Sequence, residues 1–235
     1  MQQDHTSKQF DADMESIRSS VMATGGLLER QLTRSIEALK TGDLELVSRV
    51  VQDEREVNEM QVQVDQMCSH LIARWQPAAK DLRAVLTVMQ IMGDLERIGD
   101  ETKKIAMKAQ QIHGAELLTL IRTNEVKHAF ELAHQMLSMA LDAYARLDLT
   151  AAAEVVSRDE QVDAEFHSIL RHLISYMMED PRTISAAIEI IFVAKSIERI
   201  GDHAKNIAEA VVHVVKGKDM RHASPAEMKR EASSN

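Results

Sequence analysis

The string Leu95-Glu96-Arg97-Ile98-Gly99-Asp100 recurs as Ile197-Glu198-Arg199-Ile200-Gly201-Asp202, 102 positions further on (198 minus 96). The similarity continues after the string, where Lys103-Lys104-Ile105-Ala106 matches Lys205-Asn206-Ile207-Ala208. A repeat of this kind in a chain of 235 residues indicates an internal duplication. The chain is therefore predicted to consist of two copies of one structural unit.

The segments before the string repeat as well, at a spacing of 105 positions (162 minus 57). Val57-Asn58 corresponds to Val162-Asp163, and Glu54 corresponds to Asp159. The boundary between the copies is predicted near Gly114, which gives a first unit over residues 1–114 and a second unit over residues 115–217. Residues 218–235 are expected to form a flexible tail, because polar and small residues dominate there.

Apolar residues recur at steps of three, four and seven along each unit, which is the pattern of long amphipathic helices. Aromatic residues, prolines and glycines are scarce, so a strand-rich fold is disfavoured. Gly42 is expected to end the first helix, Asp43 to cap the second and Pro77 to end the second. The predicted fold is all-α, with two tandem, pseudo-symmetric three-helix bundles and six long helices in all. These helices are expected at about 10–39, 43–71, 78–105, 126–147, 149–178 and 181–215.

The net charge of −9 excludes the basic face that direct binding to nucleic acid requires. Cys68 is the only cysteine, so an internal disulfide is excluded and a reducing, cytoplasmic location is expected. The N-terminus is polar and no apolar run reaches the roughly 20 residues that cross a bilayer. A membrane association is therefore expected only through partner proteins.

Acidic residues pair at a spacing of four, which places both side chains on one side of a helix. The pairs are Glu96 with Asp100, Glu198 with Asp202, Asp159 with Asp163, and the modified pair Glu54 with Asn58. Like charges at this spacing destabilise a helix by roughly 0.2–0.5 kcal/mol, so something must offset the repulsion. A bound cation is one answer, since oxygen ligands suit hard or borderline metal ions. Neutralisation by Arg97 and Arg199 is the alternative.

The glycine of each string lies inside a predicted helix, where it costs about 1 kcal/mol relative to alanine. Close approach of a neighbouring helix or of a bound ion would explain Gly99 and Gly201. Inheritance from the duplicated ancestor without selection is the other explanation.

The chain resembles the PhoU family of phosphate-signalling proteins over almost its full length. The segments that carry the resemblance are Met22–Glu29, Gln76-Pro77, Asp81-Leu82-Arg83, both Glu-Arg-Ile-Gly-Asp strings and Tyr176–Asp180. The resemblance implies two pseudo-symmetric three-helix bundles and a homodimer. It also implies surface metal sites at Glu96, Asp100, Glu198 and Asp202, supported by Asp159 and Asp163, with Mg, Mn, Fe or Zn as the ion. Glu54 with Asn58 departs from the family pattern, and weaker metal binding is expected there because an amide replaces a carboxylate.

In function, the resemblance implies a cytosolic adaptor and not an enzyme. Such proteins link the ATPase subunit of the phosphate ABC transporter to the sensor histidine kinase PhoR. They keep the phosphate-starvation (Pho) regulon off and restrain phosphate uptake.

Two alternatives stay open at the level of sequence, a metal-free helical scaffold and a di-iron carboxylate oxidase. Di-iron sites in helical bundles take Glu-x-x-His pairs from separate helices. Glu125 with His128 and Glu131 with His134 have the spacing but share one predicted helix. Cys68 falls in the apolar pattern and is predicted to be a packed thiol and not a nucleophile.

Overall fold

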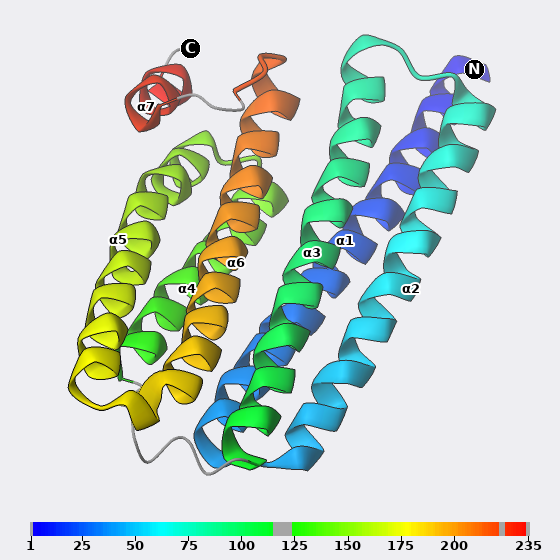
Figure 1. Ribbon diagram of the computed structural model, residues 1–235. Helices are drawn as coiled ribbons and strands as arrows, with labels where there is room; N and C mark the ends of the chain where they lie inside the picture. Colours follow the sequence, from blue (N-terminus) through cyan, green and yellow to red (C-terminus); the bar gives the residue numbers. More distant parts are fainter. Residues whose placement is uncertain (1, 115–123, 221–223, 234–235) are drawn as a thin grey trace.

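The computed structural model describes residues 2–114, 124–220 and 224–233, with side chains from residue 8 onward. Within these ranges the regular structure is entirely helical, which confirms the predicted fold class. Six long helices within these ranges pack in two groups of three, and the two groups lie side by side in Figure 1.

The first bundle contains α1 (Gln2–Thr41), α2 (Leu44–Trp75) and α3 (Ala79–Gly114), which pack against one another. Gly42 has the left-handed backbone angle φ = +72°, a conformation that glycine adopts without a steric penalty. Asp43 then caps α2, because its side chain accepts a hydrogen bond from the backbone nitrogen of Glu45 at 2.8 Å. The predicted turn between the first two helices is therefore confirmed.

The second bundle contains α4 (Asn124–Arg146), α5 (Leu149–Glu179) and α6 (Ile184–Lys216). The last of these helices was expected to start at Pro181, but the residues Pro181–Thr183 form a separate 3₁₀ turn, η2, ahead of α6. The side chain of Asp180 accepts from the backbone nitrogen of Arg182 at 3.0 Å, which fixes this tighter turn.

The two bundles meet mainly along α3 and α6, which run antiparallel through the middle of the molecule, with a smaller contact between α1 and α4 (Figure 1). Since α3 and α6 each face two other helices of their own bundle and one helix of the other, they are buried on several sides. The repeated strings lie in the middle of these two helices, where Ile98 and Ile200 are fully buried.

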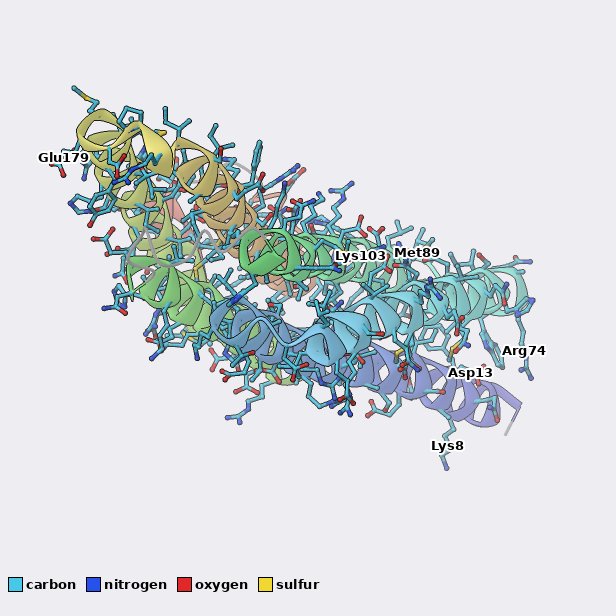
Figure 2. The ribbon with its side chains drawn as sticks, turned by 60° about the horizontal axis from the view of Figure 1, so that its bottom comes forward. Lys8, Asp13, Arg74, Met89, Lys103 and Glu179 are labelled. Carbon is cyan, nitrogen blue, oxygen red and sulfur yellow. The ribbon has the colours of Figure 1, made fainter. Side chains whose placement is uncertain are left out.

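The free ends of α1 and α2 are tied together at the far end of the first bundle. The indole nitrogen of Trp75 donates to Asp13 at 2.9 Å, and the guanidinium of Arg74 lies 4.7 Å from the Trp75 ring centroid. Figure 2 shows Asp13 and Arg74 at this end. The contact aligns the two helices beyond the reach of the central core.

The tail predicted after Gly217 differs from the structure. Residues Pro225–Ser233 form a further helix, α7, which packs on α5 and buries Met228 completely (Figure 1). Lys218 donates to Glu231 at 2.8 Å and anchors the helix across its connection. The prediction of a flexible tail was wrong for these residues, because one buried methionine and local ion pairs order a segment whose composition is polar. The predicted boundary residue Gly114 is the last residue of α3, and the segment 115–123 lies outside the described residues.

Candidate functional site

The first carboxylate cluster joins Glu54 and Asn58 of α2 to Glu96 and Asp100 of α3. Glu54 is buried, accepts from the Asn58 side-chain nitrogen at 2.8 Å and accepts from Lys103 Nζ at 3.0 Å. Lys103 projects from α3, as Figure 2 shows. One turn of each helix therefore supplies two of the predicted site residues, and a lysine neutralises part of their charge.

Burial and mutual repulsion act on the acids of this first cluster. Burial raises the pKa of Asp100, and the neighbouring Glu54 carboxylate raises it further, against the opposing effect of Lys104 and Lys103. Burial also raises the pKa of Glu96, with Asp100 adding to the shift. The cluster holds more negative charge than its surroundings stabilise.

The second carboxylate cluster repeats this arrangement with Asp159 and Asp163 of α5 and Glu198 and Asp202 of α6. Lys205 Nζ donates to the buried Asp159 at 2.5 Å, and Lys195 Nζ donates to Glu198 at 2.6 Å. Lys205 occupies the repeat position of Lys103, so the two clusters are built in the same way.

Repulsion is stronger in the second cluster, where all four predicted ligands are carboxylates. Burial raises the pKa of Asp202 to about 6, and the charges of Glu198, Asp159 and Asp163 contribute to that shift. Burial and the Asp159 charge likewise raise the pKa of Asp163. A cation brought to this cluster would relieve the repulsion directly.

The eight predicted ligands thus fall into two groups of four, as the repeat predicts. Within the ranges that the structure describes, no group of three or more His, Cys, Asp or Glu side chains is placed so that it could hold a metal ion. In each cluster a lysine ammonium group forms an ion pair with a carboxylate, Lys103 with Glu54 and Lys205 with Asp159. Each cluster nevertheless has one buried oxygen that accepts no hydrogen bond from any described residue, Asn58 Oδ1 in the first and Glu198 Oε2 in the second. Oxygen donors of this kind fit a hard cation in place of the lysine.

The glycines of the two strings face a neighbouring helix of their own bundle. A Cβ at Gly99 would lie 3.5 Å from the Val57 side chain of α2, and a Cβ at Gly201 would lie 3.4 Å from Val162 of α5. Val57 and Val162 are themselves counterparts in the repeat. Both distances are ordinary van der Waals distances, so a methyl group would fit at either position, and close packing does not by itself account for the two glycines.

Sequence reasoning missed the polar contacts between the bundles. Buried Asp94 of α3 accepts from the ring nitrogen Nδ1 of His203 at 3.0 Å, with the tautomer assigned, and from Asn206 at 3.1 Å. Buried Glu101 pairs with Arg199 of α6 at 3.1 Å. Asp94 and Glu101 are seven residues apart, so the sequence places them on one face of the same helix. The sequence does not reveal which helix packs against that face.

The other candidate residues lie apart from both clusters. Cys68 is buried, and burial raises the pKa of its thiol to about 11, which confirms a packed thiol. Glu125 and His128 both lie on α4, and they pair with His172 at 2.9 Å and with Glu165 at 3.8 Å on α5. Glu131 pairs with Lys127 at 3.5 Å on α4 itself. These surface ion pairs lack the arrangement of a di-iron site.

None of the helices in the described part of the chain combines the length and the hydropathy needed to cross a membrane.

The PhoU domain matches the chain twice, at residues 21–109 and 126–211. The chain is 42% identical to the "Phosphate-specific transport system accessory protein PhoU homolog" of Pseudomonas aeruginosa over 233 residues, which cover 98% of this chain and 95% of that protein. It is 40% identical to the protein of the same name, without "homolog", from Escherichia coli K12 over 95% of this chain and 92% of that one.

Solved structures agree with these matches. The crystal structure of PhoU from Pseudomonas aeruginosa superposes with a TM-score of 0.85 at 42% identity, covering 89% of this chain and all of that one. A phosphate transport system regulatory protein, PhoU from Streptococcus pneumoniae, shares the fold with a TM-score of 0.82 at 24% identity, over 89% of this chain and 98% of that one. With two domain matches that fall on the two bundles and close relatives over nearly the whole chain, this protein belongs to the PhoU family.

Proposed function

We propose that this protein is an accessory regulator of the phosphate-specific transport system that keeps the phosphate-starvation regulon off and restrains phosphate uptake. The observation that carries the proposal is the full-length relationship to proteins named as accessory to that system. The two carboxylate clusters at equivalent places of the two bundles fit a regulator that responds to its ionic surroundings.

The proposed mode of action is that of a cytoplasmic adaptor between the ATPase subunit of the phosphate ABC transporter and the sensor histidine kinase PhoR, with the chain as a homodimer. Exposed apolar residues on α6 support docking by helix packing, since Ile184, Ile188 and Phe192 recur at a spacing of four on one face. Surface apolar groups at this spacing are typical of helix-recognition sites.

The protein is proposed to act without catalysis of its own. A nucleophilic cysteine needs an accessible thiolate, whereas burial raises the pKa of Cys68 to about 11. The carboxylate clusters are partly neutralised by lysine, and the proposal gives them a role in binding an ion.

Each cluster is proposed to bind a divalent or iron-type cation (Mg, Mn, Fe or Zn) by displacing its lysine. In the second cluster, Asp159, Asp163, Glu198 and Asp202 would surround the ion, and Lys205 would turn toward solvent. The partnerless Glu198 Oε2 would gain a partner in that state. A bound ion supplies charge neutralisation between two helices of one bundle.

The regulatory role is tested by alkaline phosphatase activity in phosphate-rich medium, in a bacterium that lacks its own PhoU, with and without this chain. The proposal expects the chain to restore low phosphatase activity. Persistent high activity, with the protein soluble and abundant, would contradict it.

The ionic part of the proposal is tested with the double variant Glu198→Ala and Asp202→Ala in the same strain, together with metal content of the purified protein. Loss of bound metal with loss of repression is expected. The matched control is Asp11→Ala with Asp142→Ala, which removes two exposed carboxylates on α1 and α4, away from the cluster. If the cluster variant keeps both metal content and repression, the metal-free scaffold alternative replaces the metal-binding part.

A further inference from the structure

A pocket of about 760 Å³ lies between α3 and α6, where the two bundles meet. It is lined by residues of both helices, among them Gln90, Gly93, Arg97, Arg199 and Glu209. Its volume falls in the range of roughly 300–1,000 Å³ that is usual for small-molecule sites. The pocket borders the second carboxylate cluster, since Asp202 and Lys205 also line it, but the proposed regulatory role makes no use of the open space itself.

The space in the pocket depends in part on Gly93 of α3. Glycine inside a helix costs about 1 kcal/mol relative to alanine. An added Cβ at Gly99 or Gly201 would touch a neighbouring helix at 3.4 Å, whereas at Gly93 it would meet no atom of the described residues within 4 Å. The missing side chain instead leaves space in the pocket, which Gly93 lines.

The duplicated half of the molecule does not preserve this space. At the repeat spacing of 102 positions, Gly93 corresponds to Lys195 and Gln90 corresponds to Phe192. These are long side chains with contacts of their own: Lys195 lies 5.2 Å from the Phe166 ring centroid, and Lys108 lies 4.9 Å from that of Phe192. The open pocket therefore occurs beside Gly93 of α3 but not at the equivalent position of α6, so the pseudo-symmetry of the fold does not explain it.

The pocket is polar and has two different ends. Arg97 and Arg199 of the two repeated strings lie at one end, and Glu209 with Gln90 lies at the other. Arg199 and Glu209 are ten residues apart on one helix, which corresponds to about 15 Å. Arg97 is exposed and makes no hydrogen bond or ion pair with another described residue, so its guanidinium can receive a ligand.

The acids in the wall are largely occupied by the protein itself. Asp94 already accepts hydrogen bonds from His203 and Asn206, and Asp202 belongs to the second carboxylate cluster. Burial raises the pKa of Glu209 to about 7, so this group carries only part of a negative charge near neutral pH. At the arginine end, Arg199 shares its charge with Glu101, so the exposed Arg97 is the group that attracts an anion there.

We propose that this pocket binds a nucleoside phosphate, with the phosphates on Arg97 and Arg199 and the base toward Gln90 and Glu209. Guanidinium groups bind phosphate through paired hydrogen bonds. Arg97 is free to do so, and Arg199, whose Nη1 lies 3.1 Å from Glu101, would contribute its remaining N–H groups from the opposite helix. At the far end, the Gln90 amide can donate to a ring nitrogen of the base, and the Glu209 carboxyl group can accept from an amino group of the base. A ligand in this position would bridge the two bundles.

Calorimetric titration of the intact protein with ADP tests this proposal. EDTA is included so that no cation at the carboxylate clusters can bridge to the phosphates. We expect binding by the native protein, a drop in affinity of at least about tenfold for Arg97→Gln, and loss of binding for Gly93→Leu, which fills the pocket. Gly26→Leu on α1 is the matched control, because Gly26 is also a helical glycine with only one atom within 4 Å of an added Cβ, and ADP binding should be unchanged.

Adenosine and pyrophosphate separate the two ends of the pocket. The proposal expects each of them to bind more weakly than ADP, since each occupies only one end. Absence of ADP binding at millimolar concentration would overturn the proposal, as would equal affinity for pyrophosphate and ADP. Binding that persists in Gly93→Leu would place the ligand elsewhere and overturn it as well. None of these outcomes depends on repression of phosphatase.

Discussion

The two carboxylate clusters stand at equivalent places in the two bundles, but they differ in one ligand. In the first, the Asn58 amide donates to buried Glu54, and three carboxylates share the charge of Lys103. In the second, Asp163 takes the place of Asn58, and four carboxylates surround the Lys205 contact. The duplication preserved the backbone frame while the charge balance of the two copies diverged. Repulsion among the acids is present in both clusters, but the second has one more carboxylate, so an added cation should stabilise the second cluster more.

Removing the lysines should have the largest effect and should separate the two clusters. Lys205→Met leaves buried Asp159 among three other acids. We expect the free energy of unfolding to fall by about 2–3 kcal/mol. This is less than the cost of breaking a fully buried pair, because Lys205 is partly exposed. Lys103→Met should cost only about 1 kcal/mol, since Asn58 still donates to Glu54. Urea unfolding in EDTA measures both.

Lys127→Met is the control for the loss of a lysine, because its ion pair with Glu131 is exposed and should contribute less than about 0.5 kcal/mol. Equal destabilisation by Lys205→Met and Lys103→Met would remove the distinction between the clusters.

Asp202→Asn should stabilise the metal-free protein at high pH. Because the folded-state pKa of Asp202 is raised from 3.8 to about 6, the folded state binds the proton more tightly than the unfolded state. Stability is therefore lost as the pH rises from about 4 to about 6, and the full penalty is present above that range. We expect Asp202→Asn to recover about 2 kcal/mol at pH 8 and almost nothing at pH 4; the gain is below that of a fully buried group because solvent screens the half-exposed carboxylate.

The corresponding change in the first cluster, Asp100→Asn, should act in the same direction with a smaller gain, since three acids repel less than four. Unfolding at pH 4, 6 and 8 in EDTA provides the measurement. A gain from Asp202→Asn that is constant across this range would show that the titration of Asp202 is not its source.

The helix caps give the smallest expected contrast between the bundles. The Asp148 side chain accepts from two backbone nitrogens at the start of α5, at 2.9 and 3.1 Å, whereas Asp43 accepts from one at the start of α2. We expect Asp148→Ala to cost about 1 kcal/mol and Asp43→Ala about 0.5 kcal/mol. Thermal unfolding of both, beside the exposed Asp142→Ala, checks the order of the three variants.

The fold was predictable where one helix face or one turn residue decides the structure. The apolar ladders, the Gly42-Asp43 turn and the grouping of the carboxylates all follow from spacing within a helix and from the repeat. The position of Lys103 and Lys205 was also visible, because each follows its aspartate by three residues and so lies on the same helix face.

Contacts that join separate helices were not predictable in this way. Periodicity shows that Asp94 and Glu101 share a face of α3, but it does not say that α6 covers that face with His203 and Arg199. Helix α7 escaped prediction for a related reason, since its order depends on a single apolar residue, Met228, meeting a surface of α5. The pocket beside Gly93 likewise exists only once both bundles are in place.

A Mn²⁺ titration followed by electron paramagnetic resonance tests most directly whether the two clusters bind a cation with unequal affinity. The titration is done on the native protein and on the reciprocal variants Asn58→Asp and Asp163→Asn. The loss of the free-ion signal measures the amount of bound Mn²⁺. We predict that the second cluster binds Mn²⁺ more tightly than the first. Asp163→Asn should weaken that site about tenfold, and Asn58→Asp should strengthen the first site by a similar factor, in line with roughly 1.4 kcal/mol per ligand charge. Absence of Mn²⁺ binding at millimolar concentration, or affinities that neither variant changes, would contradict the assignment of these clusters as cation sites.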